Sequence, residues 1–172
     1  MTPRGTDDPG RGPAPDEGPE GTADGRYVVV GGRRWRATDP AIPDPLRAEL
    51  VAELMQGRRA VRTEGDAARP RVHDAKVALG ERGDPWWEPT EAGTRRRIEA
   101  TIRAVLRHRD AGTMCPSEAA RIVGGEGWRE LMPLVREVAA GMADAGAVRI
   151  LQRGAEVDPS TARGPIRIAP VP

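Results

Sequence analysis

The chain has 172 residues, and its 27 basic and 26 acidic side chains leave a formal net charge of +1. This length holds one domain or two small ones, and the balanced charge creates no overall field toward nucleic acid or a membrane surface. A single cysteine excludes an intramolecular disulfide. Cys115, His73 and His108 are too few for the ligand set of a structural zinc site. No apolar run approaches the roughly 18 residues that span a bilayer, and the acidic N-terminus lacks the apolar segment of a secretory signal. We therefore expect a cytoplasmic protein with no membrane anchor, metal or cofactor.

Arginine supplies almost all of the positive charge, since Lys76 is the only lysine. Together with the absence of phenylalanine and the abundance of glycine and proline, this bias is typical of a bacterial genome of high GC content. Part of the arginine content therefore reflects coding bias, and it is weak support for phosphate binding.

Residues 1–25 are predicted to be a disordered tail. They are rich in glycine and proline and carry 2 basic and 6 acidic side chains. Met1 is the only large apolar side chain among them, so the segment cannot bury enough surface to offset the entropy of ordering it.

Residues 26–89 are predicted to form a first module that begins with a β-hairpin. The β-prone Tyr27–Val30 is followed by Gly31-Gly32, which suits a two-residue turn, and the chain returns over Arg33–Arg36. In this register Val28 faces Trp35 across the strands. The two glycines could also open a phosphate-binding loop, but no dinucleotide-binding or Walker pattern surrounds them.

Two helices are expected next. The first begins near Asp44-Pro45, with Asp44 as the N-cap, and runs to about Arg62; the second covers roughly Pro70 to Leu79. The short loop between them favours an antiparallel helical hairpin. The connector that follows contains Trp86-Trp87, which either pins it against a core, the favoured interpretation, or stacks nucleic-acid bases.

Residues 90–172 are predicted to form a second module. The patterns indicate, in order, a helix over about 94–109, a single short strand at 113–114, a helix from 115 to 124, a helix opened by Pro133 and stopped by Gly146, and strands over 148–151, 156–158 and 166–168. This order is that of a winged helix-turn-helix. The fold class expected for the whole chain is therefore α+β, mainly α.

Sequence motifs of the second module resemble a bacterial winged-helix family of unknown function, over residues 94–168. The resemblance is carried by Cys115-Pro116-Ser117-Glu118, Trp128-Arg129, Leu131-Met132-Pro133, Val135-Arg136, Gln152-Arg153-Gly154, Val157-Asp158-Pro159 and Arg163-Gly164-Pro165-Ile166-Arg167. It implies the fold more than any activity.

The first module is similar to a second uncharacterised family, over residues 26–89. Its motifs are Gly32-Arg33-Arg34-Trp35-Arg36-Ala37-Thr38-Asp39-Pro40, Arg71-Val72-His73-Asp74-Ala75-Lys76-Val77-Ala78-Leu79-Gly80-Glu81-Arg82-Gly83 and Pro85-Trp86-Trp87. Such sequences are sometimes labelled biopolymer transporter of the Tol type, a label that nothing in this sequence supports.

The predicted strands and wing carry the strongest argument for binding nucleic acid, because wings commonly meet phosphates and an arginine at the tip can enter the minor groove. The candidate binding residues are Arg136, Arg149, Arg153, Arg163 and Arg167. The third helix is a poor reader of the major groove, since Glu137 and Asp144 oppose one arginine among its expected exposed positions. The first helix of this module is rich in arginine, which is either a phosphate-facing patch or a solvated face.

Two features could support catalysis, and each also has a structural interpretation that we favour. Cys115 at a helix N-terminus is either a reactive thiol or a small buried side chain. His73-Asp74 is either an acid/base pair or part of a solvated helix face. No catalytic set of residues stands out, so an enzyme is the least favoured class. The leading hypothesis is a nucleic-acid-binding protein that contacts mostly the backbone with weak sequence readout. The alternative is a protein-interaction module that uses the winged helix as a scaffold and does not bind nucleic acid.

Overall fold

The computed structural model describes residues 19–172 and confirms a mainly helical α+β fold. An N-terminal antiparallel sheet, here the N-terminal sheet, contains β1 (Glu20–Gly21), β2 (Tyr27–Val30) and β3 (Arg33–Arg36) in the order β1-β2-β3. The predicted hairpin register is confirmed, because Val28 faces Trp35. β1 lies inside the range 1–25 that the sequence predicts to be disordered, and the rest of that prediction, for residues 1–18, falls outside the described residues.

The two-residue turn between β2 and β3 is the one predicted. Gly31 and Gly32 have φ angles of 56° and 73°. Residues with a side chain rarely adopt this backbone conformation, whereas glycine does so without a steric cost. The two glycines therefore close a hairpin.

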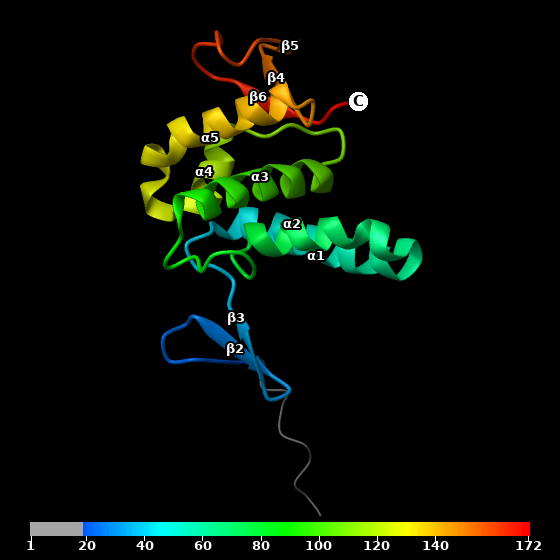
Figure 1. Cartoon of the computed structure of the whole chain (residues 1–172), viewed down its shortest axis with the longest axis vertical. Coiled ribbons are helices and arrows are strands. Elements are labelled where there is room, and N and C mark those ends of the chain that lie inside the picture. Colours follow the sequence, from blue (N-terminus) through cyan, green and yellow to red (C-terminus); the bar gives the residue numbers. More distant parts are fainter. Residues whose placement is uncertain (1–18) are drawn as a thin grey trace, which may run out of the picture.

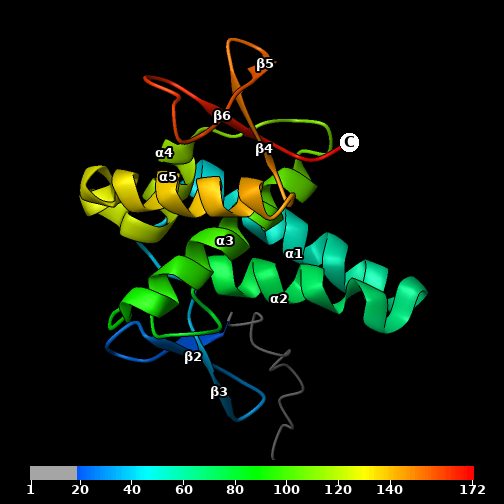
Figure 2. The same ribbon diagram turned by 45° about the horizontal axis from the view of Figure 1, so that its top comes forward.

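The helical hairpin consists of α1 (Asp44–Glu64), a short 3-10 turn η1 (Gly65–Ala68) and α2 (Arg69–Ala78). Its two helices lie side by side (Figures 1 and 2). The predicted role of Asp44 is wrong by one position: Pro43 occupies the N-cap without a side-chain cap, and Asp44 is the first helical residue. Its carboxylate forms an ion pair with Arg47 in the first turn, where the helix dipole also stabilises a negative charge.

Three further helices follow: α3 (Glu91–His108), α4 (Pro116–Gly124) and α5 (Trp128–Asp144), with a 3-10 turn η2 (Gly125–Gly127) before α5. The start of α3 is fixed by Thr90, whose hydroxyl accepts a hydrogen bond from the Gly93 amide at 3.0 Å. The amide and hydroxyl of Thr90 in turn donate to Asp84, and these bonds hold the pKa of that carboxyl below its ordinary value. Asp84 approaches so closely that a Cβ atom on Gly93 would lie 1.9 Å from its Oδ2.

The third helix of the second module begins earlier than predicted. It starts at Trp128 rather than at Pro133, which lies inside the helix. A proline there removes one helical hydrogen bond, at a cost of about 3 kcal/mol or more. The helix persists because Trp128, Leu131 and Met132 pack against the core on its inner face, while Pro133 is exposed on the outer one.

A second antiparallel sheet, here the C-terminal sheet, closes the chain. It contains β4 (Arg149–Gln152), β5 (Ala155–Glu156) and β6 (Arg167–Ala169) in the order β5-β4-β6. The predicted short strand at 113–114 is a single bridge from Met114 to Ile168. Figures 1 and 2 place the two sheets at opposite ends of the helical body.

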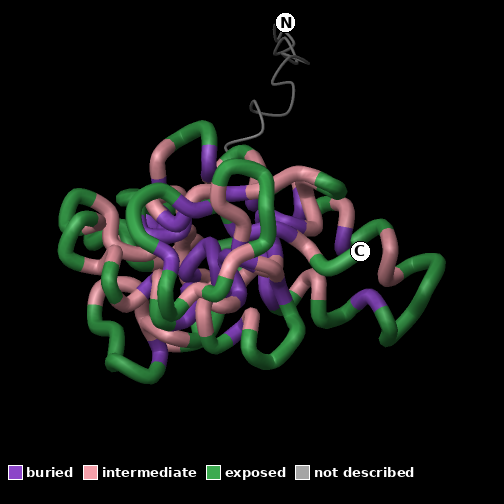
Figure 3. Tube along the Cα trace, turned by 90° about the horizontal axis from the view of Figure 1, so that it is seen from above, coloured by how far each residue is buried: buried purple, intermediate pink, exposed green. Residues whose placement is uncertain are grey.

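The two predicted modules share one cluster of buried apolar side chains. The cluster begins at Ile42, runs through all five α-helices and ends at Ile168 (Figure 3, purple). The face of α3 predicted to be apolar is buried, with Ile98, Ile102 and Val105 fully inside. The boundary proposed at residue 90 stays a prediction, but the parts on either side of it are packed together.

The tryptophan pair pins the connector, as the favoured interpretation predicts. Trp86 Nε1 donates to the Ala37 carbonyl at 3.1 Å. The Trp87 ring lies edge-on to Tyr27, with 5.6 Å between ring centroids, and Trp86 packs edge-on to Trp87. The pair therefore joins the N-terminal sheet to the helical body.

None of the helices in residues 19–172 is both long enough and apolar enough to cross a membrane.

Candidate nucleic-acid interface

Ion pairs engage every arginine of α3 and the arginine that follows it. Arg95 pairs with Glu137 at 2.9 Å, and Arg103 pairs with Glu99 at 3.0 Å. The remaining pairs are Arg96–Asp84, Arg97–Asp39, Arg107–Asp74 and Arg109–Glu49. These ion pairs argue against a free phosphate-facing patch, whereas Arg96, whose side chain is 65% exposed, fits the interpretation of a solvated face.

Arg97 is the most buried of these arginines. Its Nη2 lies 2.9 Å from Asp39 Oδ2, and its Nε donates to the Ala78 carbonyl at 3.2 Å. Burial lowers the pKa of Arg97 and the carboxylate opposes that effect, so the guanidinium stays charged. The pair joins α3 to the segment between β3 and α1.

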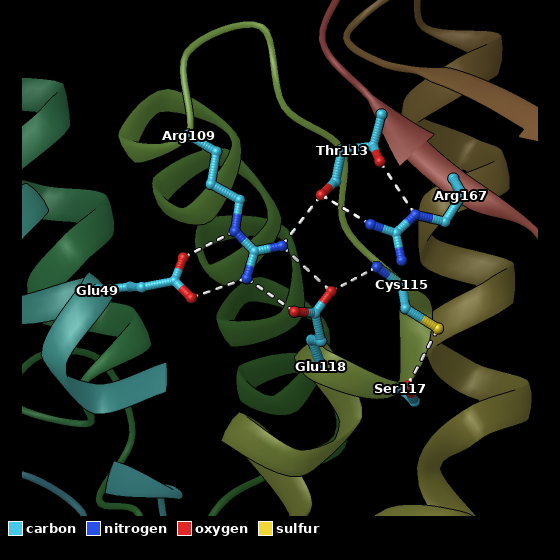
Figure 4. Close-up of polar contacts among 7 residues, drawn as sticks. All are labelled: Glu49, Arg109, Thr113, Cys115, Ser117, Glu118 and Arg167. Carbon is cyan, nitrogen blue, oxygen red and sulfur yellow. Dashed lines mark hydrogen bonds and ion pairs between the residues drawn. The ribbon is translucent and has the colours of Figure 1, made fainter. Parts of the chain in front are cut away.

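A second network surrounds Arg109, at the end of α3 (Figure 4). Its guanidinium binds Glu49 of α1 at 2.7 and 2.8 Å and Glu118 of α4 at 2.7 and 3.2 Å, and donates to the Thr113 carbonyl. These bonds raise the pKa of Arg109. Burial raises the pKa of the Glu118 carboxyl. Hydrogen bonds from Arg109 and from the Cys115 amide outweigh burial and hold that pKa below its ordinary value.

The same network reaches one of the predicted binding residues. Arg167 of β6 donates from Nε to the Thr113 hydroxyl at 3.0 Å and from Nη2 to the Thr113 carbonyl at 3.1 Å (Figure 4). Arg167 is nevertheless exposed, so one side of its guanidinium faces solvent. Thr113 thus orients the Arg167 guanidinium from the side that faces the protein.

The C-terminal sheet brings Arg167 together with two other predicted residues, Arg153 and Arg163. All three line an open pocket of about 340 Å³, whose other lining residues are Leu151, Gln152, Pro165 and Ile166. Arg153 and Arg163 are both exposed, and neither forms an ion pair with a residue in the described part of the chain. No acidic residue among positions 19–172 lines this pocket.

Local geometry fixes both arginines that the sequence places near the tip. Arg153 and Gly154 form the turn between β4 and β5, with φ angles of 52° and 83°. The Gln152 amide donates to the carbonyls of Arg163 and Pro165, which holds the returning loop beside β4. The turn and the held loop therefore place both residues beside the pocket.

The remaining two predicted residues hold the sheet in place. Arg136 of α5 donates to the carbonyls of Gly164 and Ala162, both at 3.2 Å. Arg149 donates to the Pro170 carbonyl at 3.0 Å and lies 4.0 Å from Glu156. The structure separates these two from the three arginines of the pocket.

The outer face of α5 is mostly acidic. Its exposed charged residues are Arg129, Glu130, Glu137 and Asp144. Arg129 stacks on Trp128 at 4.5 Å from the ring centroid, and Arg121 of α4 lies 4.6 Å from the same ring. No local sequence pattern predicts this trio, because the two arginines come together only when α4 and α5 pack.

The two catalytic hypotheses find no support in the geometry. Cys115 is half-buried at the N-cap of α4, where its Sγ accepts a hydrogen bond from the Ser117 hydroxyl at 3.0 Å. His73 is exposed beside Arg82, whereas Asp74 is buried against Arg107, so the idea of a shared solvated face is wrong for Asp74. Within residues 19–172, no group of three or more His, Cys, Asp or Glu side chains could hold a metal ion.

A family model described as "Protein of unknown function (DUF3253)" matches residues 95–170. This match supports the expected resemblance to a family of unknown function over nearly the same range. It gives neither a winged-helix name nor a Tol-type name, and it covers less than half of the chain. No curated protein matches the chain.

Proposed function

We propose that residues 90–172 are a winged helix-turn-helix module of a cytoplasmic protein that binds the nucleic-acid backbone. In this proposal the C-terminal sheet is the wing, and α4 and α5 are the helix-turn-helix. The order of helices and strands supports the assignment.

One observation carries the proposal of nucleic-acid binding: Arg153, Arg163 and Arg167 surround a single pocket with no acidic lining residue in the described chain. Phosphate oxygens are bound by arginine through charge-assisted, bidentate hydrogen bonds. The arginines of α3 are paired with carboxylates, whereas Arg153 and Arg163 have no carboxylate partner in the described chain, so their positive charge is available to a ligand.

The proposed contact is with phosphates rather than with base edges. The exposed face of α5 carries Glu130, Glu137 and Asp144, which would oppose the phosphates flanking a major groove. Contacts to the backbone position a protein but carry little sequence information. We therefore expect similar affinities for unrelated duplexes.

The test compares two doubly substituted proteins that lose the same charge. Arg153→Ala/Arg163→Ala changes the pocket, and Arg59→Ala/Arg62→Ala changes two exposed arginines on α1 as the matched control. Anisotropy of a labelled duplex should show binding by the unchanged protein, with a Kd on the order of 10⁻⁴ to 10⁻⁶ M at physiological salt. The pocket variant should bind more weakly, for all duplex sequences alike, and the control should not. Equal affinity of the two variants would reject the proposal.

The acidic outer face of α5 favours a second candidate, a scaffold that binds a protein partner through this helix. An open pocket of about 610 Å³ lies beside that face, lined in part by Glu137, Met142 and Asp144. Absence of duplex binding even at low salt would favour this candidate.

A further inference from the structure

The N-terminal sheet exposes large apolar side chains to solvent. Val30 and Trp35 are 53% and 47% exposed, and the strand register places both on the same face of the hairpin as Arg33. Val29, which is 37% exposed, lies on the opposite face with Arg34. The sheet projects from the helical body (Figures 1 and 2). Two adjacent exposed apolar side chains beside an unpaired arginine give a ligand an apolar and a charged contact on one face.

Trp35 lies among cations on this surface. Its ring centroid is 5.4 Å from the Arg33 guanidinium carbon and 5.7 Å from Lys76 Nζ. An aromatic ring flanked by positive charge is the arrangement on which proteins stack unpaired bases while holding the adjoining phosphates.

The arginines of this sheet differ from those of α3 in having no carboxylate partner. Arg26, Arg33 and Arg34 form no ion pair with any residue between 19 and 172. Arg34 instead stacks over Tyr27 at 4.4 Å, and Arg26 stacks over Trp87 at 4.9 Å. Aromatic rings therefore hold these guanidinium groups in place without neutralising their charge.

We propose that the N-terminal sheet is a second binding surface, which takes single-stranded nucleic acid. A base stacks on Trp35, and a neighbouring phosphate binds Arg33, which lies on the same face of the β2–β3 hairpin. Bases in a duplex are stacked on one another and cannot reach such a ring, so the surface selects single strands. Self-association through the same face would bring like charges together, which disfavours a second copy of the chain as the occupant.

This surface is separate from the proposed duplex site, because the two sheets lie at opposite ends of the molecule (Figures 1 and 2). Each site can therefore fail or succeed alone. One chain would hold a duplex at one end and a single strand at the other.

The experiment uses the full chain and a short fluorescein-labelled oligothymidylate at low salt. Trp35→Ala should weaken binding by about 5- to 150-fold, the range typical of losing one stacked base. Trp35→Phe keeps a ring and should retain most of the affinity. Arg33→Ala should also weaken binding, whereas Arg34→Ala, on the opposite face of the hairpin, and the pocket variant Arg153→Ala/Arg163→Ala should bind the single strand normally. Circular dichroism confirms that each variant keeps its helices.

Tryptophan emission gives a readout that a structural role for Trp35 would not produce. Of the four tryptophans, Trp35 is exposed and the other three are half-buried. Unlabelled oligothymidylate should quench part of the emission of the unchanged protein, and Trp35→Phe should bind without that part of the quenching.

Three results would overturn the inference while leaving the duplex proposal to its own test. The first is no binding of the single strand at low salt. The second is loss of single-strand binding in the pocket variant with Trp35→Ala unaffected. The third is sedimentation showing a dimer that Trp35→Ala converts to a monomer, which would identify a second copy of the chain as the occupant.

Discussion

Arg97 and Asp39 form an ion pair inside the protein, with 2.9 Å between Arg97 Nη2 and Asp39 Oδ2 and side chains that are only 10% and 6% exposed. Asp39 also accepts a hydrogen bond from the Ala41 amide, and its own amide donates to the Leu79 carbonyl. The pair thereby fixes the segment that leads from the N-terminal sheet into α1 against α2 and α3.

Breaking this pair should be strongly destabilising. Arg97→Ala leaves the Asp39 carboxylate buried without a partner, which typically costs about 3–5 kcal/mol. Replacing both charges, in Arg97→Met/Asp39→Leu, should cost less than the single change. Urea denaturation followed by circular dichroism measures both. A loss of less than about 1 kcal/mol for Arg97→Ala would contradict the assigned role of the pair.

The start of α3 depends on the close approach of Asp84 to Gly93. Gly93→Ala places a Cβ atom against the Asp84 carboxylate and should cost about 1–3 kcal/mol. Asp84→Ala removes the acceptor for the Thr90 amide and hydroxyl and should also destabilise the protein. Since the shorter alanine side chain leaves more room beside position 93, adding Gly93→Ala to Asp84→Ala should cost less than making it alone. Additive losses in this double-mutant cycle would show that the two positions do not interact.

The Glu118 carboxylate should make stability depend on pH in the acidic range. Its pKa in the folded protein lies below the ordinary value of 4.5, so its charge stabilises the fold above that value. This stabilisation is lost as the pH falls through the folded pKa. Glu118→Gln keeps an acceptor for the Cys115 amide but removes the charge beside Arg109. The unchanged protein should therefore melt at a higher temperature than Glu118→Gln near neutral pH, and the difference should shrink below pH 4.5. A difference that does not vary with pH would rule out this charge as its source.

Arg136 should act on the loop that carries Arg163. Because Arg136 donates to the carbonyls of Ala162 and Gly164, Arg136→Ala should speed hydrogen exchange across residues 159–166. Arg129→Ala removes an exposed arginine of the same helix and is the control. Equal exchange in the two variants would show that Arg136 does not order the loop.

The sequence predicts the elements of this fold better than it predicts the partners of charged side chains. Apolar periodicity and turn residues identify the hairpin at Gly31-Gly32 and all five α-helices, since these signals are local. The start of α5 at Trp128 is missed because a proline inside a helix is tolerated only when packing compensates for it.

The candidate site shows the same limit. Arg153 lies at the predicted turn, whereas Arg163 lies in the loop before β6 rather than on a strand or at the tip. The convergence of both with Arg167 depends on the pairing of β4 with β6. The ion pairs of Arg97 and Arg109 join positions about 60 residues apart, which no local pattern encodes.

The salt dependence of duplex binding tests the central claim most directly. Each phosphate contact contributes about 0.9 to the slope of log affinity against log salt concentration. If Arg153 and Arg163 each bind a phosphate, the slope for Arg153→Ala/Arg163→Ala should be shallower than that of the unchanged protein by about 1.8. Arg59→Ala/Arg62→Ala should keep the original slope. Parallel slopes for the unchanged protein and the pocket variant would contradict the account, because the two arginines would then make no phosphate contact.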